Sequence, residues 1–379
     1  MQYLFLFFKE ETLKVKIAHC ADLHLESKSE TKNYEIKETF LNMLKVCKGE
    51  NANFLLISGD FFDDTSVNEK TLLWVKNELE NFGLKTIISP GNHDPFTNDS
   101  PYNKGAWPKN VYIFKENKLT HFDFPELKTK IFGAAFTSIY QKKTLFNLKE
   151  NLDDDFLNIC VMHGTMTKSS DEFYNPISPS KIEESGFDYV ALGHIHKRSE
   201  ILKLGKTLCA YSGSICPKGF SETGAKGIYI GEISKNEQSF KFKKVCKHSY
   251  EKITLDISGV SSISDFILES IKSNFGEGFE NNSYEITLTG EVEEEFNLDT
   301  DAIKLFLSRH VHFASIKDKT ETKIDIAKLN LRSDFKSLFI KEALKQINDA
   351  ETKEEKEIAK TALKLGLKAF AEDVTYSDN

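Results

Sequence analysis

The chain has 379 residues, of which 40 % are hydrophobic and 28 % are charged, and this composition excludes collagen-like and disordered proteins. Its length predicts two or three domains rather than one. The formal net charge of -8 argues against a uniformly basic nucleic-acid coat, so any phosphate-binding surface must be local or must borrow positive charge from a metal or a partner.

The cysteines and the N-terminus bear on the compartment. Six cysteines lie singly along the sequence, without a C-x-x-C pair. We therefore expect free thiols and no disulfides, as in a reducing compartment. The N-terminal run MQYLFLFF is too short to span a membrane and lacks a cleavage signal, so it predicts an edge strand or a disordered leader. Because no other run approaches transmembrane length, we expect a cytoplasmic protein without membrane contact.

From Val15 onward, short apolar runs alternate with amphipathic segments. The runs VKIAHCA, NFLLISG and LKTIISPG predict strands. The segments between them, EIKETFLNMLKVCKG and NEKTLLWVKNELENFG, predict helices, the second closed by Gly83. Continuous apolar strands separated by helices indicate a sheet that is buried on both faces and binds ligands beyond the carboxyl ends of its strands.

Further strands complete a two-sheet domain. They are predicted at VYIF, KIFGAAF, LNICVMHG and FDYVALGH, and hairpins are predicted around ILKLGKTLCAYSGS and AKGIYIGEI. We therefore predict an α/β fold for residues 15–245, with two sheets packed as a sandwich and flanked by helices.

Two smaller parts follow this domain. Residues 250–320 mix strand and helix patterns and predict a small α+β domain. Residues 333–373 are rich in Lys and Glu and predict two helices, one with an apolar stripe formed by Ile358, Ala362, Leu365 and Ala369. Either this stripe packs on its own domain or it docks on another protein.

Five predicted strands end in side chains that can bind a metal ion. These side chains are Asp22 and His24, Asp60, Asn92 with His93 and Asp94, His163, and His194 with His196. If the chain stays extended beyond Gly193, His194 and His196 point to the same side and converge. Each motif alone is most often a capped or solvated loop. Together, at the edge where an α/β sheet binds ligands, they predict a metal centre.

The ligand set indicates two cations. Enough ligands for two ions come from Asp22, His24, Asp60, Asn92, His163, His194 and His196, if one carboxylate bridges the ions and water fills the open positions. Oxygen and imidazole ligands without thiolate suit Mn²⁺, Fe or Zn²⁺ better than Mg²⁺ or Ca²⁺. Two such ions about 3.5 to 4 Å apart generate hydroxide and stabilise the attacking and leaving oxygens in phosphoryl transfer.

The motifs DLH, GDFFD, GNHD, MHG and GHIH together resemble the calcineurin-like metallophosphoesterase superfamily. Within it, GHIHK followed by YSGSICPKGFSETGAKG is similar to the SbcD exonuclease and double-strand-break repair nuclease family. The resemblance is strong over residues 15–232, faint over 250–316 and architectural beyond. It implies a metallophosphoesterase sandwich, a capping domain over residues 250–320, and a C-terminal helical segment that binds an SbcC-like ATPase.

The resemblance also implies a role for each site residue. One metal would be held by Asp22, His24, Asp60 and His196, and the other by Asp60, Asn92, His163 and His194. Asp60 would bridge the two ions, for which we expect Mn²⁺. The unliganded His93 would contact the phosphate and assist the leaving oxygen, and Asp63 would orient His93. We expect His19, on the first strand, to have a packing role.

Three functions remain open. The first is a two-metal DNA nuclease, exonuclease and also endonuclease, that acts in DNA repair as a homodimer with an SbcC-like ATPase. The second is a phosphodiesterase or phosphatase for nucleotides or other small phosphoesters, because the motifs specify phosphoester chemistry and not the leaving group. The YSGS run and the residues beyond the catalytic domain favour the first. A binding module with a decayed site is disfavoured, because every ligand position is filled.

Three basic clusters are candidates for contact with DNA. They are Lys142-Lys143, Lys197-Arg198 and the run from Lys241 to Lys247. Clusters of this size are most often solvated surface, so the sequence leaves both interpretations open.

Overall fold

The computed structural model describes residues 14–148, 152–169, 171–293, 296, 298–323 and 334–371. The strand or leader predicted for the N-terminal run lies outside these residues. The chain divides into two units, Met1–Ser249 and Tyr250–Asn379.

The first unit is built on two sheets, as predicted, and each of them has six strands. One sheet contains β1 (Val15–Cys20), β2 (Phe54–Ile57), β3 (Lys85–Ile88), β4 (Val111–Ile113), β11 (Gly227–Ile233) and β12 (Gln238–Lys244). Its strand order is β12-β11-β1-β2-β3-β4. The four strands β1 to β4 run parallel, whereas β11 runs antiparallel to both of its neighbours.

The second sheet has the order β5-β6-β7-β8-β10-β9. Its strands are β5 (Thr120–Phe124), β6 (Thr129–Gly133), β7 (Leu157–His163), β8 (Tyr189–Gly193), β9 (Leu202–Leu204) and β10 (Thr207–Tyr211). The central strands β6, β7, β8 and β10 run parallel, and the edge strands β5 and β9 are antiparallel to their neighbours. The carboxyl ends of the parallel strands therefore gather at one edge of each sheet.

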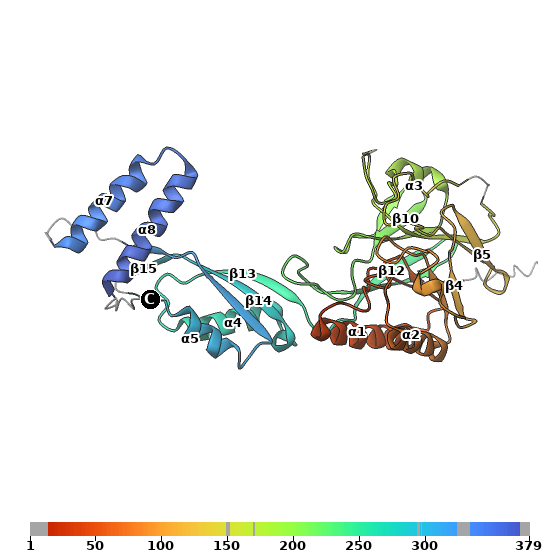
Figure 1. Cartoon of the computed structure of the whole chain (residues 1–379), viewed down its shortest axis with the longest axis horizontal. Helices are drawn as coiled ribbons and strands as arrows, with labels where there is room; N and C mark the ends of the chain where they lie inside the picture. The colour runs from red at the N-terminus through yellow and green to blue at the C-terminus, as the bar shows by residue number, and fades with distance from the viewer. Residues whose placement is uncertain are drawn as a thin grey trace, which may run out of the picture. The chain divides into compact units, whose positions relative to one another are not determined.

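Alternating side chains place one core between the sheets and others under the helices. In β2, Phe54 and Leu56 pack between the sheets, whereas Leu55 and Ile57 pack under helices α1 (Glu30–Gly49) and α2 (Glu69–Phe82). The short helix α3 (Pro179–Ser185) covers the outer face of the second sheet through Ile182. Figure 1 shows α1 and α2 on one side of the strands and α3 on the other.

The local signals explain where the main helices start and stop. The Ser29 side chain accepts a hydrogen bond from the Lys32 backbone N–H, and the Asn68 side chain caps α2 in the same way. Helix α2 ends at Gly83, which has a φ of 75° that favours glycine. Strand β5 is a half-exposed edge strand of mixed polarity, and α3, which starts at Pro179 and stops at Gly186 with a φ of 75°, is only seven residues long.

The second unit contains a three-stranded parallel sheet of β13 (Tyr250–Asp256), β14 (Ser283–Thr289) and β16 (Phe313–Asp318). Helices α4 (Ile263–Phe275) and α5 (Thr300–Leu307) pack on it through Ile267, Ile271, Ile303 and Leu307. A further parallel pair joins β15 (Glu291–Glu293) to β17 (Glu321–Lys323). Short 3-10 helices occur at Pro101–Asn103, Pro125–Leu127 and Phe279–Asn281.

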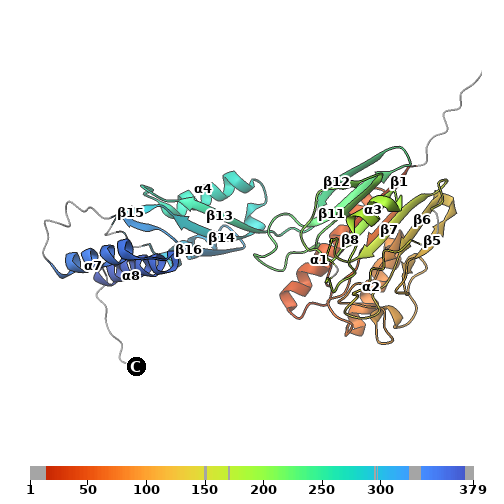
Figure 2. The same cartoon turned by 90° about the horizontal axis from the view of Figure 1, so that it is seen from above.

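Helices α7 (Phe335–Asp349) and α8 (Lys353–Ala371) lie side by side in both views (Figures 1 and 2). They pack through Ile340, Ala343, Leu363 and Leu367. The predicted apolar stripe lies on another face of α8, where Ile358 is 64 % and Leu365 62 % exposed. A membrane-spanning helix would need a long apolar stretch, and no helix within the described ranges has one.

His19 is a core residue of β1, in agreement with the packing role predicted for it. The side chain is fully buried, with Nδ1 2.8 Å from the Tyr189 hydroxyl and Nε2 3.2 Å from the Leu192 carbonyl oxygen. Burial lowers the pKa of His19 to about 3. The folded chain therefore keeps this ring neutral at pH values where the unfolded chain protonates it.

We predict that His19→Gln makes the stability of the chain less sensitive to acid. Unfolded His19 takes up a proton below its ordinary pKa of about 6.5, and the folded ring does so only near pH 3. Between these values the unfolded state binds one more proton, so the free energy of unfolding falls by about 1.4 kcal/mol per pH unit of acidification. Glutamine does not titrate. Urea unfolding of the metal-free variant at several pH values should therefore show that its free energy of unfolding falls less steeply with acidification, by this amount per pH unit. An unchanged slope would mean that the buried ring is already charged.

Candidate metal centre

The predicted ligands lie together at one edge of the two sheets. Strands β1, β2 and β3 run into the loops that carry Asp22 and His24, Asp60, and Asn92, and β7 and β8 end at or next to His163 and His194. The first two loops are joined by backbone hydrogen bonds from Asp22 N to Gly59 O and from His24 N to Asp60 O, both 3.0 Å long. The positions of the ligands are therefore fixed by the sheet and by the pairing of its loops.

Asp22, His24 and His196 form a first cluster. The Nε2 atoms of His24 and His196 are 3.1 Å apart, and Asp22 Oδ1 lies 3.9 Å from His196 Nε2. The Nδ1 atom of His24 lies 2.9 Å from the Asp63 carboxylate, and that of His196 lies 2.7 Å from the Glu222 carboxylate. His196 Nδ1 therefore donates to Glu222, and the Asp63 carboxylate lies beside His24 Nδ1, so that both Nε2 atoms face the same space. A cation bound there would be held by both Nε2 atoms.

Asp60, Asn92, His163 and His194 form a second cluster. His163 Nε2 lies 2.9 Å from Asn92 Oδ1 and 3.4 Å from Asp60 Oδ2, and His194 Nδ1 lies 3.1 Å from Asn92 Oδ1. His163 Nδ1 lies 2.9 Å from the Ser58 carbonyl oxygen, which can only accept. In the neutral ring, Nε2 is therefore the free ligand atom, and it faces two oxygen atoms. This second group of acceptors also fits a cation.

Asp60 lies between the two clusters. Its Oδ2 atom is 3.9 Å from His24 Nε2 in the first cluster and 3.4 Å from His163 Nε2 in the second. The ligand atoms of Asp22, His24 and His196, and those of Asp60, His163 and His194, are each close enough together to hold an ion. The ligand atoms of the two clusters thus fit two cations that would share the Asp60 carboxylate.

Four of these residues have backbone conformations that are unusual for residues other than glycine. The φ angles are 54° for Asp22, 51° for His24, 49° for Asp60 and 99° for His194. Such conformations cost of order 1–3 kcal/mol each and cluster at functional sites. The angle at His194 also corrects the expectation that the chain stays extended beyond Gly193. Because the backbone turns there, His194 enters the second cluster and His196 the first.

Two glycines explain the close approach of the loops. A Cβ atom on Gly59 would lie 2.2 Å from His163 Nδ1, and one on Gly193 would lie 1.8 Å from the Ser58 carbonyl oxygen. Neither position has room for a side chain. The glycines of the GDFFD and GHIH motifs therefore allow the two sheets to bring their ligands together.

His93 lies at the exposed rim of the site. Its backbone N–H donates to Asp60 Oδ1 at 3.0 Å, and its ring centroid is 4.7 Å from that of His24. The ring Nδ1 lies 3.0 Å from the backbone carbonyl oxygen of Asp63. We expected Asp63 to orient His93. The Asp63 backbone carbonyl contacts the His93 ring, whereas the Asp63 carboxylate lies beside the buried His24.

The two imidazoles of the second cluster have opposite tendencies to hold a proton. Burial disfavours the charged form of His163, but the adjacent Asp60 carboxylate outweighs it and raises the pKa to about 9. Burial, together with repulsion from His163, lowers the pKa of His194 to about 4. Without a metal ion the cluster therefore keeps its proton on His163, and an incoming cation must displace it.

Glu222 completes the site, although sequence analysis assigned it no role. Its carboxylate accepts hydrogen bonds from Ser214 Oγ at 2.9 Å and from the Lys218 backbone N–H at 3.2 Å. Burial opposes its ionisation, but the hydrogen bond with His196 lowers its pKa to about 2. Glu222 lies within the run YSGSICPKGFSE that carries the narrower resemblance, and this run is the signal that could have identified it.

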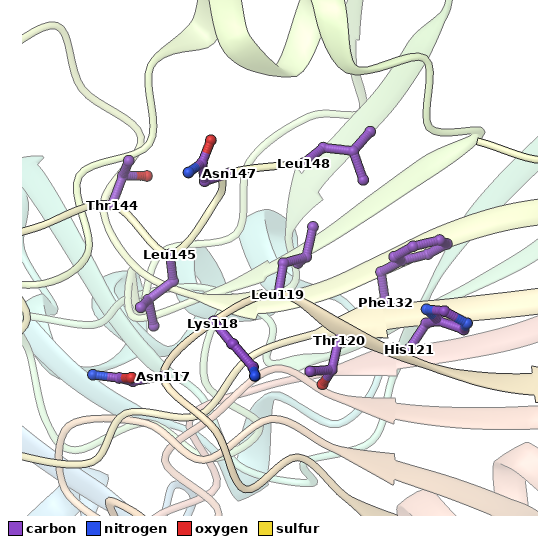
Figure 3. Close-up of a pocket in the computed structure, with 10 residues that line it drawn as sticks. All are labelled: Asn117, Lys118, Leu119, Thr120, His121, Phe132, Thr144, Leu145, Asn147 and Leu148. Atoms are coloured by element: carbon purple, nitrogen blue, oxygen red, sulfur yellow. The ribbon is translucent and has the colours of Figure 1, made fainter. Parts of the chain in front are cut away.

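Two hollows of the first unit differ in their relation to this centre. A hollow of about 560 Å³ is lined by Lys118, Leu119, His121, Phe132 and Leu145, among others (Figure 3), and its lining residues all differ from the predicted ligands. A smaller hollow of about 190 Å³ is lined by His24, Asp63, Cys216 and Lys218. This smaller hollow adjoins the first cluster.

Residues 15–198 match the family described as Calcineurin-like phosphoesterase. The "Uncharacterized metallophosphoesterase YhaO" of Bacillus subtilis is 29 % identical over 266 residues, covering 65 % of this chain and 64 % of that protein. The "DNA double-strand break repair protein Mre11" of Methanopyrus kandleri is 22 % identical over 272 residues, covering 65 % of this chain and 60 % of that protein. The protein of the same name from Saccharolobus solfataricus is 22 % identical over 293 residues, covering 68 % of this chain and 72 % of that protein. The chain thus spans less than two thirds of the length of the first two relatives.

We predict that the chain binds two Mn²⁺ ions, that His163→Ala binds fewer, and that His93→Ala still binds two. His163 Nε2 points into the second cluster, whereas His93 contacts Asp60 through a backbone N–H that alanine keeps. Elemental analysis after gel filtration in Mn²⁺ gives the stoichiometry.

One equivalent or less in the wild type would contradict the two-metal interpretation. Loss of an ion from His93→Ala would make its ring a ligand, in the alternative grouping of His24, Asp60 and His93.

Proposed function

We propose that this chain, which contains a calcineurin-like metallophosphoesterase domain, is a two-metal nuclease that hydrolyses phosphodiester bonds in DNA. The observation that carries the proposal is the pair of acceptor clusters sharing Asp60 at the edge of the sheets. Two relatives are named for DNA double-strand break repair, which supports DNA as the substrate. The proposal covers the activity, the substrate and the partners of the whole chain.

The residues of the chain have distinct tasks in this reaction. Cations held by the two clusters would supply a hydroxide nucleophile and would offset the charge that develops on the phosphate oxygens. The Glu222 carboxylate accepts from His196 Nδ1 and the Asp63 carboxylate lies beside His24 Nδ1, contacts that direct both Nε2 atoms inward. His93 is held at the rim through Nδ1, so its Nε2 can donate a proton to the leaving oxygen when the ring is protonated.

Exposed aromatic side chains continue outward from the second cluster. The Tyr174 ring centroid lies 4.7 Å from that of His194 and 5.9 Å from that of Tyr140. The Phe173 ring centroid lies 6.1 Å from that of Tyr140, and Lys142 Nζ lies 4.7 Å from the Phe173 ring centroid. Tyr140 is 59 % and Phe173 47 % exposed. Aromatic faces beside a cation suit an unpaired base and its phosphate, which supports a nucleic-acid substrate.

The basic clusters differ in how free they are to contact DNA. Lys241 and Lys243 each pair with Glu50, at 2.7 and 2.8 Å, and Lys247 pairs with Glu38 at 3.1 Å. These contacts already offset much of their charge. We therefore assign the first phosphate contact to Lys142, whose ammonium group lies beside the exposed aromatic rings.

A phosphodiesterase or phosphatase for nucleotides or other small phosphoesters is the second candidate. It would use the same metal centre, and the aromatic rings would serve a mononucleotide as well as a DNA strand. The relative from Bacillus subtilis is named only as a metallophosphoesterase, without a substrate. The length of the substrate therefore separates the two functions.

We predict that the Mn²⁺-loaded chain digests end-labelled single-stranded or duplex DNA, and that two variants affect this activity differently. His93→Ala should lower turnover on DNA and on a small chromogenic diester by about 10²- to 10⁴-fold, the usual contribution of a positioned acid. Phe173→Ala should raise KM for single-stranded DNA by about one to two orders of magnitude, because a stacked base contributes about 1–3 kcal/mol. It should leave hydrolysis of the diester unchanged. Steady-state kinetics on both substrates test this.

An abasic oligonucleotide is the matched control. Wild type should bind it about as weakly as Phe173→Ala binds the normal strand, and the substitution should matter little on it. Hydrolysis of mononucleotide diesters with no digestion of longer DNA would instead assign the chain to the small phosphoesters.

We also propose that α7 and α8 dock on the coiled-coil root of an SbcC-like ATPase. Leu363 and Leu367 hold α8 against α7, so the exposed stripe of Ile358, Ala362, Leu365 and Ala369 is left over by this packing. Apolar residues at this spacing are typical of a helix that lies in a groove of a partner. The homodimer expected through the helices of the first unit stays a prediction.

We predict that cutting the chain after residue 330 abolishes ATPase binding and leaves metal-dependent hydrolysis of the diester largely intact. Within the full chain, Leu365→Glu should weaken binding, because it places a charge in the exposed apolar stripe. Lys356→Glu, at an exposed polar position of the same helix, is the control. Co-purification with the ATPase reports binding. If the truncated chain still co-purifies, the docking site lies elsewhere.

A further inference from the structure

Two cysteine thiols meet beside the first ligand cluster. The Sγ atoms of Cys216 and Cys246 are 3.9 Å apart, within hydrogen-bond contact. Cys216 is 6 % and Cys246 1 % exposed, and all six cysteines carry free thiols in the structure. The metal centre uses neither of these two sulfur atoms as a ligand. Their contact therefore calls for a separate explanation.

The pair differs in reactivity from the other buried thiols. Hydrogen bonding between the two lowers the pKa of Cys246 and raises that of Cys216, which favours one shared proton. The Thr39 hydroxyl also donates to Cys246 Sγ, at 3.6 Å. By contrast, burial raises the pKa of Cys209 to about 11 and that of Cys47 to about 12. Because the thiolate is the form that reacts with oxidants, the pair is the most reactive of these positions.

A small oxidant has a route to the pair. Cys216 lines the hollow of about 190 Å³ that His24, Asp63 and Lys218 also line. Both cysteines lie outside helices and strands, Cys216 after Ser214 and Cys246 after the end of β12. Their sulfur atoms can therefore approach each other without breaking a strand or a helix.

We propose that Cys216 and Cys246 form a site of reversible oxidation, at which hydrogen peroxide joins the two sulfur atoms in a disulfide. The thiolate attacks one peroxide oxygen and breaks the O–O bond, which gives a sulfenic acid and hydroxide. The second thiol then attacks the sulfenic sulfur and releases water. One peroxide takes two electrons from the thiols and leaves as two water molecules. The sulfur atoms must close from 3.9 Å to a bond of about 2.05 Å.

The disulfide would act on the metal centre through Glu222. Cys216 lies between Ser214 and Lys218, both of which donate to Glu222 Oε2, at 2.9 and 3.2 Å. Glu222 Oε1 in turn holds His196 Nδ1 at 2.7 Å. Movement of Cys216 towards Cys246 displaces both donors and loosens the orientation of His196. Loss of such a partner lowers metal affinity by about 10- to 100-fold, and we expect the lower end for a displaced one.

The disulfide is tested on the full chain in metal-free form. After treatment with hydrogen peroxide and then catalase, thiols are counted under denaturing conditions and the linked peptides are identified by mass spectrometry. We expect two thiols fewer than in the reduced chain and a peptide joining Cys216 to Cys246. Cys216→Ser should give no joined peptide and lose at most one thiol, as a sulfenic acid on Cys246, whereas Cys209→Ser should lose two like the wild type. An unchanged thiol count, or a bond between other cysteines, overturns the site.

The link to the metal centre rests on the proposed metal site and is measured by calorimetry with Mn²⁺ alone. We expect oxidation to raise the Kd for one Mn²⁺ ion by about tenfold, dithiothreitol to reverse this, and Cys216→Ser to show no change on oxidation. A disulfide without a change in Kd overturns the link through Glu222. Because neither measurement uses hydrolysis, failure of the nuclease proposal and failure of this site are distinguishable.

Discussion

The gathering of buried acceptor atoms at one sheet edge is the constraint that the rest of the first unit has to satisfy. Two imidazole nitrogens face each other at 3.1 Å, and a third lies 3.4 Å from the Asp60 carboxylate. Glu222 fixes the other nitrogen of His196, and a proton on His163 or a bound cation can hold such atoms together. A rigid frame is needed to hold such groups together. It is supplied by the two six-stranded sheets, the paired loops and the glycines that let them approach.

The sequence predicts the parts of this arrangement that depend on position along a strand. Apolar runs indicate buried parallel strands, and ligands that follow those runs must share an edge. The turn at His194 could not be predicted, because its φ of 99° is imposed by the surrounding loops and not by a local residue preference. The contact of the Asp63 carboxylate with His24 and the place of Glu222 beside His196 also depend on tertiary structure. Glu222 in particular lies in an irregular segment, where no periodicity reports which way a side chain points.

The helical tail shows a different limit of sequence patterns. Helix α8 has two apolar faces, one with Leu363 and Leu367 and the other with Ile358 and Leu365. Spacing identifies both as amphipathic stripes, but it cannot tell which one packs on α7. The structure assigns the first to the helix pair and leaves the second exposed. Strand β5 was not predicted for a related reason. It lies at the edge of its sheet and is only partly buried, so its short sequence THFDF has no continuous apolar run.

The left-handed backbone at Asp22, His24, Asp60 and His194 has a consequence for how this chain could change over time. At these four positions glycine would fold with less strain, so stability and metal binding favour different residues. A related chain that no longer binds metal could become more thermostable by replacing these four residues with glycine, one after another. Such a chain would keep its two sheets and lose its ligands first at the strained turns. At these clustered ligands, the conformation thus marks positions where metal binding outweighs backbone strain.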